Sequence, residues 1–255
     1  RDAAAEVVAL SEKLQAPLIH TTRSKDIIDN RHPNVLGGIG IMGAHPSNHA
    51  LHEGDLLIVV GSNFAWRAFY PAGVPIVKID CDPIHLATHI PVTHPILGDA
   101  KVAVTGLADR VDQRGDDSFL VKSRKPFVKM IDEYTFKAKK TKPGKPVHPA
   151  AVVDGIAQNL TEDAIVCGDS GSTTIWFNNI AMLNGKQRFL WSANLATLGG
   201  GMPQAIGASF AAPDRQVVMI AGDGGFQMSI QDLVTAAMYE RPIKCFVLNN
   251  GCYRF

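Results

Sequence analysis

Residues 216–226, QVVMIAGDGGF, place a single carboxylate among glycines directly after an apolar run that is typical of a buried strand. A second apolar run, residues 243–250 (IKCFVLNN), also ends abruptly in polar side chains, and a helix-like stretch separates the two. In a parallel sheet, the carboxyl ends of the strands form the edge that binds ligands. The pattern therefore predicts neighbouring parallel strands that bring Asp223 and Asn250 to one edge.

The same alternation of helical periodicity and short β-branched runs extends along the chain. Residues 16–22 (APLIHTT), 55–62 (DLLIVVGS) and 74–82 (VPIVKIDCD) are strand-like runs of the first half. This alternation predicts an α/β protein with two Rossmann-like, doubly wound domains of parallel sheet. The basic stretch KAKKTKPGKP predicts a solvated linker between them. We expect a first domain over residues 1–112, incomplete at its N-terminus, a linker with a helix over 113–148, and a second domain over 149–255, incomplete at its C-terminus.

Composition excludes several classes of function. The 255 residues carry 25 Lys and Arg against 24 Asp and Glu, a net charge of +1, so there is no overall field to attract nucleic acid. No long apolar span predicts a membrane segment. The four cysteines show no CxxC spacing, which favours a reducing, cytoplasmic setting.

Asp223 and Asn250 are suited to one kind of metal. Carboxylate and amide oxygens are hard ligands, and Mg²⁺ favours a few protein oxygens together with phosphate oxygens. The adjacent glycines would let the backbone turn tightly and approach a phosphate. The pattern thus predicts a site for a metal ion and a diphosphate. The alternative is that each motif is only a turn, because either one is common by itself.

The GDG and NN motifs at this spacing resemble the thiamine diphosphate (ThDP, thiamine pyrophosphate) binding motif. The surrounding sequence, WSANLATLGGGMPQAIGASFAAPDRQVVMIAGDGGF, resembles the diphosphate-binding domain of the pyruvate oxidase and acetolactate synthase superfamily. The resemblance implies that Mg²⁺ is bound by the side chains of Asp223 and Asn250 and by the backbone carbonyl of Cys252. It also implies that Leu198, where many relatives have Met, supports the folded conformation of the cofactor. The residues expected to contact ThDP are Gly171, Ser172, Thr173, Ala196, Thr197, Leu198, Asp223, Gly224, Gly225 and Asn250.

One of these assignments has an alternative. Residues 171–173 could form only a Ser/Thr-capped helix start rather than a diphosphate loop.

In the first half, residues 38–43 (GIGIMG) formally match the GxGxxG pattern of NAD-binding proteins. That match lacks a good preceding strand and the acidic residue expected about 20 positions later, so we do not expect NAD binding.

The first half instead resembles the central, FAD-carrying domain of pyruvate oxidases, especially the quinone-reducing pyruvate dehydrogenase type. The resemblance rests on residues 38–43, on VVGSNFAWRAFYP and on VKIDCDPIHLATH. It implies that Asp80 meets ribose hydroxyls and that Arg67 pairs with phosphates. The alternative is a domain retained for packing alone, without FAD. The residues expected to line FAD are Ile39, Gly40, Ile41, Met42, Ser62, Asn63, Phe64, Ala65, Trp66, Arg67 and Asp80.

The resemblance implies an enzyme that decarboxylates a small 2-oxo acid such as pyruvate with ThDP, Mg²⁺ and FAD. In this superfamily a Glu from a separate pyrimidine-binding domain activates the cofactor, and we find no match to that domain. We therefore expect a homo-oligomer or a partner that supplies it, and little or no turnover by this chain alone. The alternatives are an acetolactate synthase-like carboligase with structural FAD and a catalytically silent cofactor-binding fragment.

Overall fold

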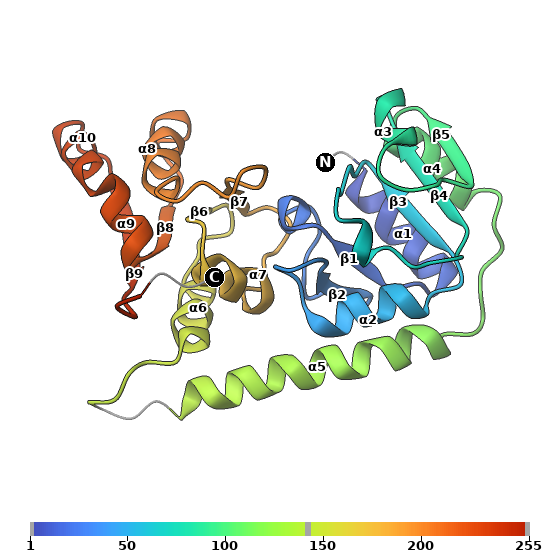
Figure 1. Ribbon diagram of the computed structural model, residues 1–255, viewed down its shortest axis with the longest axis horizontal. Helices are drawn as coiled ribbons and strands as arrows, with labels where there is room; N and C mark the ends of the chain where they lie inside the picture. The colour runs from blue at the N-terminus through green and yellow to red at the C-terminus, as the bar shows by residue number, and fades with distance from the viewer. Residues whose placement is uncertain (1–2, 141–143, 253–255) are drawn as a thin grey trace. The chain divides into compact units, whose positions relative to one another are not determined.

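The computed structural model describes residues 3–140 and 144–252, so residues 141–143 of the expected linker lie outside the described part (Figure 1). The chain divides into two compact units. The first comprises Arg1–Thr21 and His32–Lys129, and the second comprises Thr22–Arg31 and Met130–Phe255. Every paired strand of the named sheets runs parallel to its neighbour, which confirms the predicted α/β class. Among the described residues, no helix is long and apolar enough to span a membrane.

The first unit contains a three-stranded sheet in the order β3-β4-β5 and a separate β1-β2 pair. Apolar side chains pack on both faces of the larger sheet: Leu10, Ile79 and Val104 form one cluster, and a second is built around Val59 and Ile76. The elements are α1 (Ala4–Leu14), β1 (Leu18–His20), β2 (Val35–Gly38), α2 (His45–Glu53), β3 (Leu57–Val60), η2 (Arg67–Phe69), β4 (Ile76–Asp80), α3 (Pro83–Ala87), β5 (His94–Leu97) and α4 (Ala100–Ala108).

The second unit contains a four-stranded sheet in the order β7-β6-β8-β9. Its elements are η1 (Thr22–Ser24), α6 (Pro149–Gln158), β6 (Ile165–Gly168), α7 (Ser172–Ile180), β7 (Arg188–Trp191), α8 (Gly201–Ala211), β8 (Val217–Gly222), α9 (Asp223–Ser229), η3 (Ile230–Asp232), α10 (Leu233–Met238) and β9 (Ile243–Leu248). Strand β9 pairs with β8 along its whole length, as the two apolar runs predict.

Alternate residues of the central strands explain why helices cover both faces of this sheet. Val166, Val218 and Ile220 point to the side where α6 and α7 pack. Cys167 and Met219, one position removed, point to the opposite side and pack against α8. Because successive side chains of a strand point to opposite faces, continuous apolar strands need cover on both.

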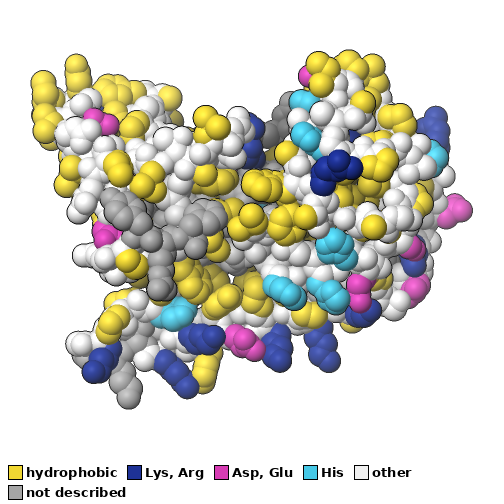
Figure 2. All heavy atoms as spheres, viewed as in Figure 1, with side chains coloured by type: hydrophobic (Ala, Val, Ile, Leu, Met, Phe, Trp, Pro, Cys, Tyr) yellow, Lys and Arg dark blue, Asp and Glu magenta, His cyan; other side chains and the backbone are white. Residues whose placement is uncertain are grey.

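Helix α5 (Ser118–Lys139) occupies most of the expected linker and is amphipathic. Leu120, Phe127 and Ala138 are buried along one side, whereas Lys and Arg side chains gather on the outer side (Figure 2). Ala138 lies inside the stretch expected to be a solvated linker, yet it is buried in the core of the second unit. The basic side chains can remain in water while the opposite face is buried.

One segment far away in sequence belongs to the second unit. In Thr22–Arg31, the buried Lys25 ammonium donates to the carbonyl of Asn178 at 2.9 Å. The amide of Phe189 donates to the buried Asp26 carboxylate at 3.1 Å. Asn30 exchanges hydrogen bonds with the backbone of Leu183. No local sequence pattern predicts this placement.

Candidate functional site

Asp223 and Asn250 lie at the same edge of the second sheet because their strands are paired. Gly222, the last residue of β8, is directly opposite Leu248, the last residue of β9. Asp223 then begins α9, and Asn250 follows two positions after Leu248. Helices α9 and α10 connect the two parallel strands, as the helix-like stretch between the two apolar runs predicts.

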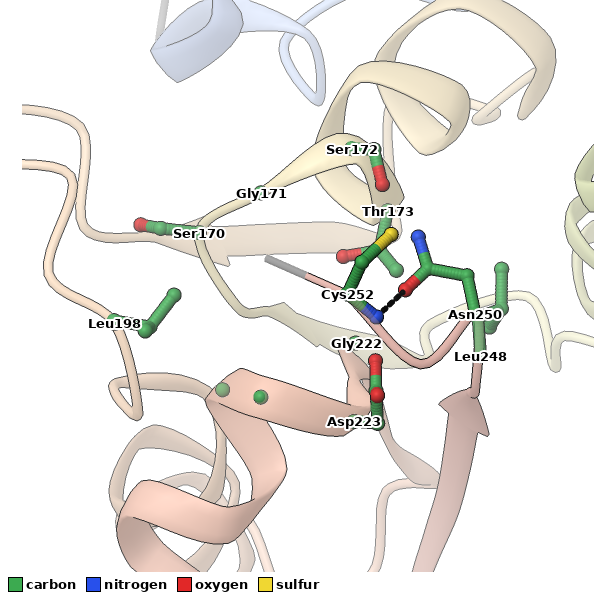
Figure 3. Close-up of a pocket in the computed structure, with 12 residues that line it drawn as sticks. Ser170, Gly171, Ser172, Thr173, Leu198, Gly222, Asp223, Leu248, Asn250 and Cys252 are labelled. Atoms are coloured by element: carbon green, nitrogen blue, oxygen red, sulfur yellow. Dashed lines mark hydrogen bonds between the residues drawn. The ribbon is translucent and has the colours of Figure 1, made fainter. Parts of the chain in front are cut away.

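These strand ends border a small open hollow (Figure 3). Three segments line it besides the two strand ends: the β6–α7 loop, the loop before α8 and the first turn of α9. Of the residues expected at ThDP, Ala196 and Thr197 are exposed and do not line the hollow. The lining residues are Ser170, Gly171, Ser172, Thr173, Leu198, Gly222, Asp223, Gly224, Gly225, Leu248, Asn250 and Cys252.

Asp223 and Asn250 bring side-chain oxygen atoms to the hollow. The turn after β9 folds back, so the Cys252 amide donates to Asn250 Oδ1 at 3.1 Å. Figure 3 shows the Asp223 carboxylate facing this turn, with Cys252 beside Asn250. An amide oxygen has two lone pairs, so Asn250 can accept this bond and still bind a cation. A carboxylate with amide and carbonyl oxygens fits Mg²⁺.

The lining of the hollow also includes buried hydroxyl groups. Ser170 Oγ and Thr173 Oγ1 are buried and have no hydrogen-bond partner in the described structure. A buried hydroxyl without a partner costs roughly 1–3 kcal/mol, so a bound acceptor at this position would relieve that cost. Both lie where α7 begins, and a helix N-terminus leaves backbone N–H groups for an anion. These donors fit a diphosphate.

Ser170 was not among the residues that the sequence predicted. The motif resemblance drew attention to residues 171–173, and the burial of the Ser170 hydroxyl is visible only in the folded loop. Cys167, three positions earlier, is a buried core residue, and burial raises the pKa of its thiol to about 12. It is therefore not a nucleophile for this site.

The loop before α8 brings one apolar side chain to the hollow. Leu198 is 38% exposed and lies across from the Asp223 and Asn250 side in Figure 3. The preceding Ala196 has a left-handed backbone with φ of +48°, which is strained for a residue with a side chain. Such strain is typical of loops whose geometry serves a ligand.

The residues expected at FAD belong to the first unit, and two of their segments meet. Gly40 follows β2 with φ of +89°, and a Cβ placed on it would lie 3.0 Å from the Phe64 ring. Asn48 fixes this turn by accepting from the Gly40 amide and donating to its carbonyl. Asp80 ends β4, which lies beside β3, the strand before residues 62–67. Trp66 and Arg67 are exposed, whereas Met42 is buried and Ile41 is 57% exposed.

Two protein-family models match the chain. Residues 1–107 match the model described as "Thiamine pyrophosphate enzyme, central domain". Residues 169–255 match "Thiamine pyrophosphate enzyme, C-terminal TPP binding domain". The second match includes every residue that lines the hollow.

Individual relatives agree with these models. The chain is 33% identical to a protein of Bacillus subtilis, YdaP, named as thiamine pyrophosphate-containing, over 96% of this chain and 42% of that protein. It is 30% identical to pyruvate oxidase of Lactiplantibacillus plantarum, over 100% of this chain and 42% of the relative. It is 29% identical to the acetolactate synthase isozyme 1 large subunit of Escherichia coli, over 98% and 44%. The chain thus spans less than half the length of these relatives. It belongs to the thiamine pyrophosphate-dependent enzyme superfamily that includes pyruvate oxidase and acetolactate synthase, and it carries the central and C-terminal TPP-binding domains of that superfamily.

Proposed function

We propose that this chain forms the cofactor-binding part of a ThDP- and Mg²⁺-dependent enzyme that decarboxylates a small 2-oxo acid such as pyruvate. The observation that carries the proposal is the hollow at the edge of the second sheet. Asp223 and Asn250 offer oxygen ligands on one side, and the unpartnered hydroxyls of Ser170 and Thr173 offer hydrogen-bond donors among the residues that line it. A metal diphosphate needs both kinds of group close together.

Each part of the hollow has a role in this proposal. The side chains of Asp223 and Asn250 and the backbone carbonyl of Cys252 hold Mg²⁺. Ser170, Ser172 and Thr173 bind the diphosphate, together with the amides at the start of α7. Leu198 supports the ring system from the loop before α8. ThDP, when bound, supplies the electron sink for decarboxylation, so the chain's task is to bind and orient it.

Catalysis in this proposal also requires a carboxylate from a pyrimidine-binding domain. We infer that a neighbouring copy of the protein or a partner subunit supplies this carboxylate; one of the relatives above is itself named as a large subunit. The four cysteines are free, which supports a reducing, cytoplasmic location.

The first unit is proposed to bind FAD through residues 39–42 and 62–67, with Asp80 at the ribose. The meeting of Gly40 and Phe64 supports a shared binding surface for these segments. A pyruvate oxidase-like reaction would pass electrons to this flavin. The second candidate is an acetolactate synthase-like carboligation with structural FAD, which the similarity to acetolactate synthases favours equally.

Flavin spectroscopy separates the two reactions. The chain, reconstituted with ThDP, Mg²⁺, FAD and a pyrimidine-binding domain, is mixed anaerobically with pyruvate. Bleaching of the oxidised flavin band at the rate of carbon dioxide release would support the oxidase. Acetolactate formation with an unchanged flavin band would support the carboligase. Carbon dioxide release without ThDP would contradict both.

A further inference from the structure

A buried carboxylate next to the lining of the hollow has no role assigned so far. Asp169 follows β6 and is only 1% exposed. Its two carboxylate oxygens accept from backbone amides on different segments: Ser170 at 2.8 Å, Gly199 at 3.2 Å and Gly200 at 3.1 Å. Asp169 is not among the site residues predicted from the sequence.

These hydrogen bonds make Asp169 the cap of helix α8. Gly200 is the N-cap residue of α8 and has no side chain that could satisfy the first amides of the helix. Asp169 supplies the missing acceptor from another element, because it accepts from the Gly199 and Gly200 amides. A carboxylate at a helix N-terminus satisfies unpaired N–H groups and interacts favourably with the helix dipole. The start of α8, and with it the loop that carries Leu198, is thereby tied to β6.

A third segment fits closely around the same carboxylate. A Cβ placed on Gly225 would lie 2.0 Å from Asp169 Oδ2, so only glycine permits this approach. Gly225 belongs to the first turn of α9, two residues after the proposed metal ligand Asp223. Asp169 therefore touches all three loops that join the sheet to the hollow: the β6–α7 loop, the loop before α8 and the GDGG turn.

The ionised carboxylate of Asp169 is unfavourable at its buried position. Burial raises the pKa of the Asp169 carboxyl, and the surrounding amides only partly oppose that shift. A raised carboxyl pKa means that the ionised group is held less favourably in the native state than in the unfolded chain. At neutral pH the buried charge thus subtracts from stability.

We propose that Asp169 is a positioning residue. It fixes the loop from Ala196 to Gly201 relative to strand β6, and so holds Leu198 where it can support bound ThDP. This inference rests on the proposed function. Asp169 does not line the hollow, so it acts through the backbone amides that it holds. Without its carboxylate, the β6–α7 loop, the loop that carries Leu198 and the GDGG turn would no longer be fixed relative to one another.

The test compares Asp169→Asn with the unsubstituted chain. Asn keeps the shape, but it replaces one acceptor oxygen by a donor that faces N–H groups. Asp214→Asn, at an exposed carboxylate in the turn before β8, is the matched control. Amide hydrogen exchange of residues 196–201 is measured in the free chain, together with global unfolding in urea. The near-ultraviolet circular dichroism of bound ThDP is then measured at saturating ThDP and Mg²⁺.

Asp169→Asn is expected to speed local exchange at least tenfold where Asp214→Asn does not, and to alter the dichroism of the bound cofactor even at saturation. A merely structural role would lower global stability and leave that spectral signature unchanged. Unchanged exchange at residues 196–201 would overturn the inference, as would an unchanged spectrum in Asp169→Asn. If the unsubstituted chain binds no ThDP, both the proposed function and the cofactor-positioning role of Asp169 are wrong. The exchange data still show whether Asp169 holds the loop.

Discussion

Asp223 and Asn250 leave neighbouring parallel strands at the same edge of one sheet, because Gly222 and Leu248 are directly paired. This pairing brings a carboxylate and an amide oxygen to a hollow whose other lining includes two buried hydroxyls without partners. The proposed metal and diphosphate site follows from that combination.

Adjacent threonines of α7 should respond oppositely to loss of their hydroxyls. Thr173 Oγ1 has no partner in the described structure, whereas Thr174 Oγ1 donates to the Asp169 carbonyl. Both side chains are buried. We expect Thr173→Val to leave the free energy of unfolding unchanged or to raise it by up to about 1 kcal/mol, and to lower ThDP affinity roughly tenfold.

Thr174→Val is the matched control and should lose about 1 kcal/mol of stability, since it removes a satisfied hydrogen bond. Urea unfolding and calorimetric titration with ThDP and Mg²⁺ measure both effects. If Thr173→Val binds ThDP as tightly as the unsubstituted chain does, the Thr173 hydroxyl does not bind the diphosphate.

The turn at Gly40 offers a test of the first unit. Gly40 and Gly73 both have positive φ, +89° and +72°, but only Gly40 is packed against a side chain, Phe64. Gly73→Ala should cost about 1 kcal/mol for the backbone alone, and Gly40→Ala roughly 2 kcal/mol because the ring must also move. FAD fluorescence titration should show weaker binding for Gly40→Ala only. Equal FAD affinity in both variants would show that the turn at Gly40 does not contribute to FAD binding.

The buried Lys25 should give stability a distinctive pH dependence. Burial lowers the pKa of Lys25 to about 7, whereas an unfolded lysine titrates near 10.4. Between these values the unfolded chain binds more protons than the native protein, so stability rises with pH by up to about 1.4 kcal/mol per unit. Below about pH 7 both states are protonated and this rise ends.

Lys25→Met lacks this titration, so the stability of the unsubstituted chain relative to Lys25→Met should rise between about pH 7 and pH 9. Urea unfolding at the two pH values measures the difference, and Lys145→Met, at an exposed position, is the control. A constant difference between the unsubstituted chain and Lys25→Met would show that Lys25 stays charged in the native state.

Local patterns were sufficient for much of this structure. The apolar runs ending in Asp223 and Asn250 predicted their shared edge, because parallel strands bury apolar side chains on both faces and expose polar groups only where they end. Asp169 and Ser170 were not predicted, since their importance depends on burial and on amides contributed by residues about 30 positions away. The docking of Lys25 and Asn30 into the second unit also depends on contacts about 150 positions distant, which no local periodicity encodes.

Calorimetric titration with ThDP, with and without Mg²⁺, tests the central claim most directly. It is performed on the unsubstituted chain, on Asp223→Ala and on Asp214→Ala, whose carboxylate lies in an exposed turn away from the lining of the hollow. We predict Mg²⁺-dependent binding in the unsubstituted chain and in Asp214→Ala, and no measurable binding in Asp223→Ala. Binding that survives in Asp223→Ala, or that is the same without Mg²⁺, would contradict the assignment of this hollow as the metal and diphosphate site.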